Sequence, residues 1–226
     1  MSEFDRYIDD YKTMLDESLA PLGGSNDYYL LQKVNLLKNA TEQTSIQSIL
    51  DFGCGLGGTT LMLKNAFLQS RVVGIDISEL SLDKARQHCS SIEFGCTSDK
   101  EFMDSCVGAF DIIYVANVFH HVSPEDRISV MESLKLMLTD KGKIFFFEHN
   151  PYNPITKWVV SRCKFDESAI LLLPKESRLL FKKAGFKIES TKYILFFPYI
   201  LRYFSKVEIF FGWLPLGAQY CVTATK

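Results

Sequence analysis

The stretch ILDFGCGLGG, residues 49–58, contains the strongest structural signal in the chain. It starts as a short apolar run rich in strand-forming residues and ends in closely spaced glycines. A buried strand that stops at such glycines turns sharply and lets a ligand or a helix approach its backbone. The glycines match GxGxG at Gly53, Gly55 and Gly57, and they also match the dinucleotide pattern GxGxxG. The loop therefore predicts a nucleotide-like ligand and leaves open which one, with a purely structural turn as the alternative.

On both sides of this loop, strand-like apolar runs alternate with helix-like segments. The strands are expected at 46–52, 71–76, 92–95, 110–118, 143–147, 186–193 and 219–225. The helices are expected at 28–37, 59–67, from Ser78 onward, from Ser123 to about Gly142, and at 177–184. This alternation predicts an α/β fold in which helices cover both faces of a mostly parallel sheet, a three-layer sandwich. Its ligands would bind at the carboxyl ends of the strands.

The composition is that of a globular protein. Of the 226 residues, 47% are hydrophobic and 23% are charged, which excludes a disordered or fibrous chain. We expect a single domain with an N-terminal helical cap at 1–45, a cofactor-binding core at 46–150, and an acceptor-side lid with the last strands at 151–226. The acidic start MSEFDRYIDD and the lack of an uncharged run of about 18 residues predict neither an export signal nor a transmembrane segment.

The cysteines and the net charge narrow the location and the partners. The six cysteines have no metal-binding spacing, which predicts reduced thiols and a cytoplasmic protein. A net charge of −2 argues against a nucleic-acid partner. Residues 1–140 hold 11 basic and 21 acidic residues, whereas 141–226 hold 14 and 6. Either the C-terminal part faces an anionic partner, or the two parts neutralise each other within one fold.

Two aspartates help to identify the ligand of the glycine loop. Asp51 lies two residues before Gly53, where it would repel the pyrophosphate of a dinucleotide. S-adenosylmethionine instead carries an ammonium and a sulfonium group, which a carboxylate favours. Asp76, at the end of the second strand, can accept hydrogen bonds from the ribose of either ligand, with a helix cap as the simpler interpretation.

Four segments together resemble a known family. ILDFGCGLGG, VVGIDIS, FDIIYVANVFHHV and LTDKGKIFFFEHN follow one another like the motifs of class I S-adenosylmethionine-dependent methyltransferases, in particular small-molecule enzymes of the ubiquinone and menaquinone type. The resemblance covers about residues 46–150, and KKAGFKI and QYCVTATK fit the last helix and strands. It implies a Rossmann-like, seven-stranded, mostly parallel sheet with an antiparallel last strand. It also implies S-adenosyl-L-methionine as cofactor and S-adenosyl-L-homocysteine as product.

The resemblance also implies roles for individual positions. The three glycines would line the methionine end of the cofactor, and Asp51 would bind its amino group. Asp76 would hold the ribose, Ile77 would cover the adenine face, and Asn117 would lie on the methionine side. Many members have an acidic residue near the adenine amino group, where this chain offers Thr97 or Ser98. From the N-terminal region, Tyr29 would form an aromatic lid over the cofactor or pack in the core.

The acceptor chemistry rests on the residues that follow the fourth and fifth strands. A hydroxyl acceptor needs a base to remove its proton, whereas amines and thiolates need none. The candidates are Glu148 and His149 after the fifth strand, and His120, with His121 beside it, after the fourth. Their spacing matches no metal-ligand pattern, so no metal is expected.

The remaining segments bear on the acceptor. Pro151 and Pro154 predict a long ordered loop or lid without a regular helix. Residues 193–217 mix aromatic and basic side chains, which indicates either peripheral membrane contact or a buried insertion or dimer contact. The expected acceptor is a small molecule, anionic or lipid-linked: a sugar, a quinone precursor or a lipid-linked intermediate. The alternative functions are an NAD(P)-dependent oxidoreductase and a non-catalytic S-adenosylmethionine-binding module, and either a monomer or a homodimer fits.

Overall fold

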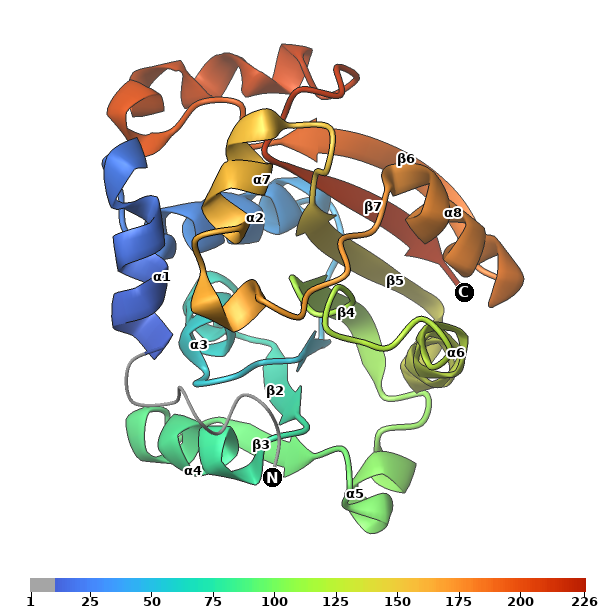
Figure 1. Cartoon of the computed structure of the whole chain (residues 1–226). Helices are drawn as coiled ribbons and strands as arrows, with labels where there is room; N and C mark the ends of the chain where they lie inside the picture. Colours follow the sequence, from blue (N-terminus) through green and yellow to red (C-terminus); the bar gives the residue numbers. More distant parts are fainter. Residues whose placement is uncertain (1–10) are drawn as a thin grey trace.

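The computed structural model describes residues 11–226 and is built around one seven-stranded sheet (Figure 1). The strand order is β3-β2-β1-β4-β5-β7-β6, and β7 alone runs antiparallel to its neighbours. The strands are β1 (Ser48–Phe52), β2 (Arg71–Asp76), β3 (Glu93–Cys96), β4 (Phe110–Ala116), β5 (Leu138–His149), β6 (Lys187–Ile194) and β7 (Gln219–Thr225). The predicted α/β fold, with its mostly parallel sheet and antiparallel last strand, is confirmed.

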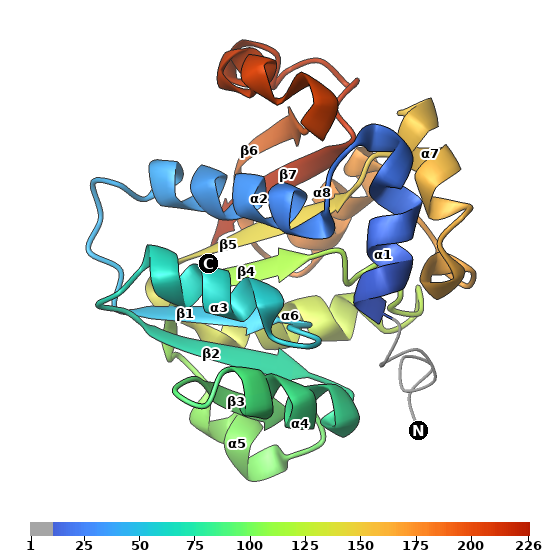
Figure 2. The same ribbon diagram turned by 90° about the vertical axis from the view of Figure 1, so that its left-hand side faces the viewer.

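Helices cover both faces of this sheet, as Figure 2 shows from the side. The α-helices are α1 (Tyr11–Leu19), α2 (Asn26–Ala40), α3 (Gly58–Ala66), α4 (Glu79–His88), α5 (Lys100–Ser105), α6 (Arg127–Met137), α7 (Pro154–Val160) and α8 (Pro174–Lys183). Three 3₁₀ segments join them: η2 (Ala20–Leu22), η3 (Lys164–Asp166) and η4 (Tyr199–Phe210).

The core explains why the strands read as continuous apolar runs. Successive strand residues point to opposite faces, so Ile49 packs in the cluster under α2 and α3 while Leu50 packs in the cluster under α6 and α8. A sheet that is buried on both faces needs apolar side chains at every position. The register then aligns Phe52 with Ile75 and Val115, so the carboxyl ends of β1, β2 and β4 meet at one edge.

Helix α6 begins later and ends earlier than the sequence predicts. The expected cap at Ser123 forms a turn instead, in which Ser123 Oγ donates to the carboxylate of Asp126, and the helix starts at Arg127. At the other end, the helix stops at Met137 rather than near Gly142. Leu138 is buried, adopts extended backbone angles and pairs with Phe110, because β5 starts there. Tertiary pairing therefore overrides the local helical pattern.

The prediction that the segment around Pro151 and Pro154 lacks a regular helix is wrong, because the seven residues Pro154–Val160 form one. Helix α7 begins at Pro154, and the Asn153 side chain accepts hydrogen bonds from the N–H groups of Ile155 and Thr156. Proline is favoured in the first turn, where its missing N–H is not needed. The pair Asn153-Pro154 therefore marks the start of a helix. In the same way, Asp99 caps the unpredicted helix α5.

The N-terminal part contributes α1 and α2, which match the helical character expected of 1–45; residues 1–10 of that range lie outside the described part. Among the described residues, no helix is both long and apolar enough to cross a bilayer.

Candidate functional site

The glycine loop follows β1 at the carboxyl edge of the sheet. Gly53, Gly55 and Gly57 have φ angles of 75°, 52° and 79°, a region that favours glycine. A Cβ atom on Gly53 would lie 2.3 Å from Cγ2 of Val118, so this glycine is needed for packing. A Cβ on Gly55 would meet no described atom within 4 Å. The backbone at Gly55 therefore faces open space, as a cradle for a ligand requires.

Asp76 lies beside this loop at the end of β2. Its Oδ2 accepts a hydrogen bond of 2.8 Å from the N–H of Gly55, and its Oδ1 accepts one of 2.9 Å from Ser78. The cap of α4 is Ser78 itself, whose side chain accepts from Ser81, so Asp76 is not merely a helix cap. A carboxylate oxygen can accept more than one hydrogen bond. The geometry is therefore compatible with ribose binding.

The residues expected near adenine lie on the same rim. Ile77 follows Asp76 and is 64% exposed, so its side chain is free to contact a ligand at this rim. Thr97 lies next to Asp76, because its N–H donates to the Asp76 carbonyl at 3.0 Å, and Ser98 is exposed. The structure thus brings Asp76, Ile77, Thr97 and Ser98 together.

Below the loop, a carboxyl and a lysine are both buried and attract each other. Asp51 is 2% exposed and accepts a 2.7 Å hydrogen bond from Thr60 Oγ1. Burial raises the pKa of Asp51 to about 7, even though the Thr60 bond pulls the other way. Lys33 of α2 is 1% exposed, and burial lowers its pKa to about 8 against the attraction of Glu148 and Asp51. Sequence reasoning missed Lys33, because a lysine within an amphipathic helix gives no signal of burial.

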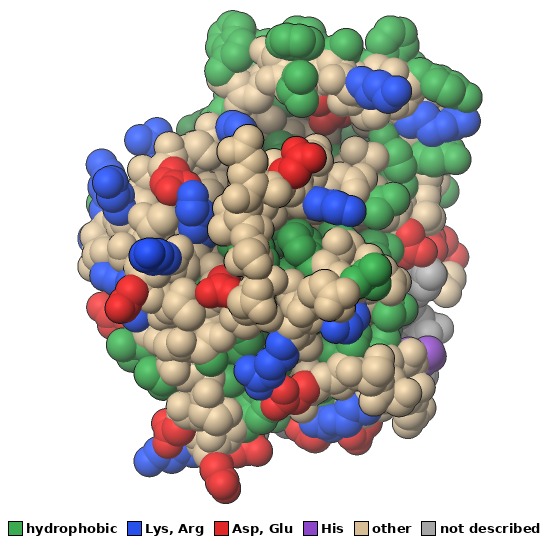
Figure 3. Space-filling view, turned by 180° about the vertical axis from the view of Figure 1, so that it is seen from behind, with side chains coloured by type: hydrophobic (Ala, Val, Ile, Leu, Met, Phe, Trp, Pro, Cys, Tyr) green, Lys and Arg blue, Asp and Glu red, His purple; other side chains and the backbone are tan. Residues whose placement is uncertain are grey.

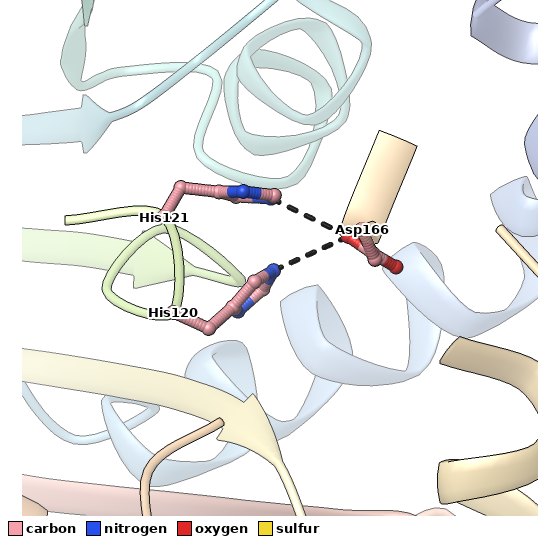
Figure 4. Close-up of side chains that lie close together, drawn as sticks. All are labelled: His120, His121 and Asp166. Carbon is pink, nitrogen blue, oxygen red and sulfur yellow. Dashed lines mark ion pairs between the residues drawn. The ribbon is translucent and has the colours of Figure 1, made fainter. Parts of the chain in front are cut away.

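The histidines after β4 converge on a residue that sequence reasoning also missed. Asp166 of η3 lies with Oδ1 at 3.5 Å from His120 Nε2 and 3.4 Å from His121 Nε2, as Figure 4 shows. On its other side, His120 Nδ1 lies 2.6 Å from Glu148 Oε2, and Glu148 Oε1 accepts from the Phe119 N–H. No local pattern marked Asp166, which reaches the site only because the lid folds back over it.

This arrangement determines which groups carry charge. Burial alone would lower the pKa of His120, but the Glu148 and Asp166 carboxylates outweigh it and raise the pKa to about 9. Burial would likewise raise the pKa of Glu148, yet the imidazole of His120 holds it below its usual value. At neutral pH the pair is therefore an imidazolium and a carboxylate. The ion pair leaves neither group readily available to accept a proton.

His149, at the end of β5, is different. Burial lowers its pKa to about 4, and the neighbouring positive His120 adds to the shift. The two rings lie 5.1 Å apart between centroids. His149 is thus a neutral imidazole and a weak base at pH 7.

Asn117 and Gln219 complete this part of the edge. Asn117 has a positive φ of 58°, which is rare outside glycine and often marks functional sites. Its Oδ1 accepts a 3.2 Å hydrogen bond from Gln219 Nε2, and that nitrogen is 3.5 Å from His149 Nδ1. Gln219 Oε1 is buried and has no hydrogen-bond partner among the described residues. A buried acceptor of this kind suits a donor group on a ligand.

Two further predictions concern a metal and a lid. In the described part of the chain, the possible ligand atoms of His120, His121 and Asp166 lie within 4.8 Å of one another. The ion pairs of Asp166 with His120 and His121 also bring these atoms together, and the absence of a metal stays a prediction. Tyr29 is 9% exposed, and its hydroxyl accepts a 3.3 Å bond from the Tyr199 N–H, which ties it to η4. Its role over the cofactor stays a prediction.

Comparison with known proteins agrees with this geometry. Residues 50–144 match the model of a methyltransferase domain. An "uncharacterized methyltransferase" of Staphylococcus carnosus is 28% identical over 145 residues, which cover 63% of this chain and 67% of that protein. A "ubiquinone biosynthesis O-methyltransferase" of Idiomarina loihiensis is 28% identical over 120 residues, covering 50% of this chain and 47% of that protein. The second match thus spans about half of its relative.

The fold is also found among solved structures. The crystal structure of a SAM-dependent methyltransferase from Archaeoglobus fulgidus aligns with a TM-score of 0.60 at 15% identity, over 88% of this chain and 99% of that one. At this identity the likeness speaks for the fold alone. The matched domain favours S-adenosylmethionine over a dinucleotide as the ligand of the glycine loop.

Proposed function

We propose that this chain, a class I S-adenosylmethionine-dependent methyltransferase, methylates a hydroxyl group of a small-molecule acceptor held beside His149 and Gln219. S-adenosylmethionine supplies a methyl group that its sulfonium charge already activates. The work left to the protein is to bind both molecules, orient the acceptor, exclude water and remove a proton.

The observation that carries this proposal is the position of His149 at the carboxyl edge, with its Nδ1 3.5 Å from Gln219 Nε2 and with Oε1 of the same glutamine unpaired within residues 11–226. Its low pKa, about 4, keeps it unprotonated at neutral pH and makes it a weak base, so it would take the proton only as the acceptor oxygen becomes acidic during methyl transfer. Glu148 and Asp166 neutralise His120 and do not compete for the acceptor proton, because their oxygens are engaged with His120, His121 and the Phe119 N–H. His149 would therefore be the base, with His120 and Glu148 as positioning residues rather than the catalytic groups that the sequence suggested.

The cofactor would lie on the other half of the edge. Gly55 and Asp76 would face the ribose and the methionine end, with Ile77, Thr97 and Ser98 around adenine. Asp51 would serve the ammonium group from below the loop, and Asn117 would bound the methionine side. The open space at Gly55 and the exposed side chain of Ile77 support this placement.

For the acceptor, a phenolic quinone precursor is the first candidate, ahead of a sugar or a lipid-linked intermediate. The name of the Idiomarina relative supports a hydroxyl acceptor. The basic residues Lys157, Arg162 and Lys164 of the lid are exposed, and Arg162 stacks over Trp158 at 5.0 Å, so an anionic acceptor gains no support from them. All six cysteines are free thiols, which supports a cytoplasmic location.

Transfer of a labelled methyl group tests the proposal. The protein is incubated with methyl-labelled S-adenosylmethionine and matched pairs of acceptors, such as an alkylated catechol and the aromatic amine of the same shape. A hexose serves as a second hydroxyl acceptor. We expect label in the catechol. Label in the amine alone, or equal transfer by a His149→Ala variant, would contradict O-methylation assisted by His149.

A further inference from the structure

The segment from Tyr199 to Leu216, called here the aromatic platform, carries large apolar side chains on the outside of the molecule. It consists of η4 and the turns that follow, and no residue of η4 is buried. Figure 3 shows hydrophobic side chains crowded along the top of the molecule, where this platform lies. Those at least 40% exposed are Ile200, Leu201, Tyr203, Phe204, Val207, Ile209, Phe210, Trp213 and Leu216. A contiguous apolar surface of this kind marks an interaction site.

The platform is held firmly from its inner side. Both carboxylate oxygens of Glu208 accept 3.0 Å hydrogen bonds, from the N–H groups of Leu195 and Phe197. The N–H of Tyr193 in β6 donates to the carbonyl of Gly212 at 2.8 Å. Tyr199 packs edge to face against Tyr28 of α2 at 5.1 Å. Because these contacts fix the backbone, the outward apolar side chains cannot fold back into the core.

The charged side chains of the platform also differ in direction: the acidic one points inward and the basic ones lie outside. Its one acidic residue, Glu208, points inward to the backbone, whereas Lys206 is exposed. Arg202 lies over the rings of Tyr199 and Tyr203, at 4.5 and 4.7 Å, with its guanidinium at the edge of the apolar surface. Apolar and aromatic side chains bordered by basic groups are the composition that binds the interface of an anionic bilayer.

A second copy of the chain fits this surface less well. In a symmetric dimer the same patch meets itself, so Arg202 and Lys206 of each copy would face the platform of the other. The platform offers no outward carboxylate to offset them, because Glu208 is engaged with its own backbone. An anionic lipid surface supplies both the apolar phase and the negative charge.

The platform also leads directly to the site. Its end is joined to the residues after β5, because Asn150 Nδ2 donates to the carbonyls of Pro215 and Gly217 at 3.1 and 2.8 Å. Three residues past Leu216 comes Gln219, whose side chain lies between Asn117 and His149. A molecule resting in the lipid interface would thus be close to the base.

We propose that the aromatic platform docks this protein on membranes that contain anionic lipids, with Ile209 and Trp213 among the inserted side chains and Arg202 and Lys206 against the lipid phosphates. This goes beyond the proposed methyl transfer, and it does not depend on it, because docking requires neither cofactor nor acceptor.

Vesicle co-sedimentation of the full chain tests this directly. Vesicles of phosphatidylcholine alone are compared with vesicles that also contain phosphatidylglycerol, at low and at high salt, without S-adenosylmethionine. The expected result is binding to the anionic vesicles that weakens as salt rises. Each basic residue near a charged membrane contributes about 1 kcal/mol, so an Arg202→Gln, Lys206→Gln variant should bind about 30-fold more weakly.

Matched controls separate docking from general effects of charge and hydrophobicity. Lys141→Gln with Lys183→Gln removes the same charge from exposed positions at the opposite edge of the sheet and should leave binding unchanged. Ile209→Ser with Trp213→Ser should weaken binding by about tenfold or more. Leu68→Ser with Val107→Ser, which alters side chains 71% and 59% exposed at the opposite edge, should not.

Three outcomes would overturn the proposal. The first is protein that stays in the supernatant with both vesicle compositions. The second is equal loss of binding in the platform variants and their controls. The third is a stable dimer by light scattering that Trp213→Ser dissociates, which would make a second copy the occupant. The methyl-transfer assay with a water-soluble acceptor measures the proposed enzymatic function separately. Membrane docking and methyl transfer can therefore each fail without the other.

Discussion

The two halves of the carboxyl edge differ in how they are built. The half formed by β1, β2 and β3 uses short loops, where Gly55, Asp76 and Ser78 contact one another within about one strand–helix unit. The half formed by β4, β5 and β7 gathers its side chains from distant parts of the chain: His120, His149, Asp166 and Gln219. A binding site for a common cofactor can be local, whereas an acceptor site assembled by tertiary contacts can change without disturbing it.

The two halves of the edge also differ in the charged groups that they hold. The half formed by β1, β2 and β3 is proposed to bind the cofactor and is called here the cofactor half; it holds a carboxyl, Asp51, with a pKa of about 7. The half formed by β4, β5 and β7 is proposed to bind the acceptor and is called here the acceptor half; it holds an ion pair beside a neutral imidazole. The first arrangement favours an incoming positive group, while the second keeps one proton acceptor free. Variants in the two halves should therefore have separable effects, and the following predictions test that separation.

The largest effect is expected in the acceptor half. His149→Ala removes the proposed base and should lower kcat by about 10²- to 10⁴-fold. The Kd of S-adenosylhomocysteine, measured by calorimetry, should change by less than about twofold, because the cofactor half is intact. His88→Ala, at an exposed histidine of α4, is the control. A parallel loss of turnover and affinity would mean that His149 supports the structure of both halves.

Asp76→Asn tests the cofactor half. It keeps the shape of the side chain but weakens hydrogen bonds to a charged acceptor, so S-adenosylhomocysteine should bind more weakly by about 1–3 kcal/mol, or roughly 5- to 150-fold. Asp104→Asn changes an exposed carboxylate on α5 and should have no effect. Unchanged affinity in Asp76→Asn would remove this residue from the cofactor site.

The ion pair of the acceptor half predicts a pH dependence of stability. The folded state raises the pKa of His120 from 6.5 to about 9, so its contribution is complete below about pH 6.5 and is lost as pH rises through 9. The unfolding free energy of the wild type should fall as pH rises from 7 to 9.5. In His120→Gln this fall should be smaller, by an amount on the order of 2 kcal/mol.

Because the pKa of Lys33 is lowered to about 8 in the folded protein, its loss of charge makes the unfolding free energy rise above pH 8, opposite to the effect of His120. The quantity to compare is therefore the difference in unfolding free energy between wild type and His120→Gln, measured by urea unfolding. His88→Gln serves as control. A difference that does not vary with pH would show that His120 is neutral in the folded protein.

Asp51→Asn should separate stability from binding. The raised pKa of Asp51 means that its ionisation opposes folding: its favourable contribution is present below about pH 4 and is lost as pH rises through 7. At pH 8 the variant should be about 1 kcal/mol more stable than wild type in thermal unfolding, yet bind S-adenosylmethionine more weakly. Lower stability at pH 8 would instead identify Asp51 as the structural partner of Lys33.

The smallest effect is expected from metal removal. Because ion pairs with Asp166 account for the closeness of His120 and His121 without a metal, dialysis against a chelator should change the methyl-transfer rate by less than about twofold. Loss of activity that zinc or another divalent ion restores would contradict this, and would make His120, His121 and Asp166 a metal site.

Much of the cofactor half could be predicted from sequence, because its signals are local. β2 has the predicted bounds and ends at Asp76 as expected, and Ser78 does cap α4. In each case the structure depends on a pattern within ten residues. The end of α6 was misjudged because Leu138 pairs with Phe110, a contact that the local pattern does not contain.

The acceptor half was predictable only in part. His120, Glu148 and His149 were found because they follow strands, but their roles were not, since the charge on each depends on its neighbours. Asp166 and Lys33 could not be found at all, because they approach the site from the lid and from α2. Asn153-Pro154 and the polar Gln219 at the start of an apolar strand were available signals that went unused.

Calorimetric titration with S-adenosylmethionine, S-adenosylhomocysteine and NADH tests most directly the claim that the carboxyl edge holds a methyl donor. The structure predicts that the first two bind, that NADH does not, and that Asp76→Asn weakens both. Binding of NADH alone would contradict the account and would mean that Asp51 and the glycine loop serve a dinucleotide.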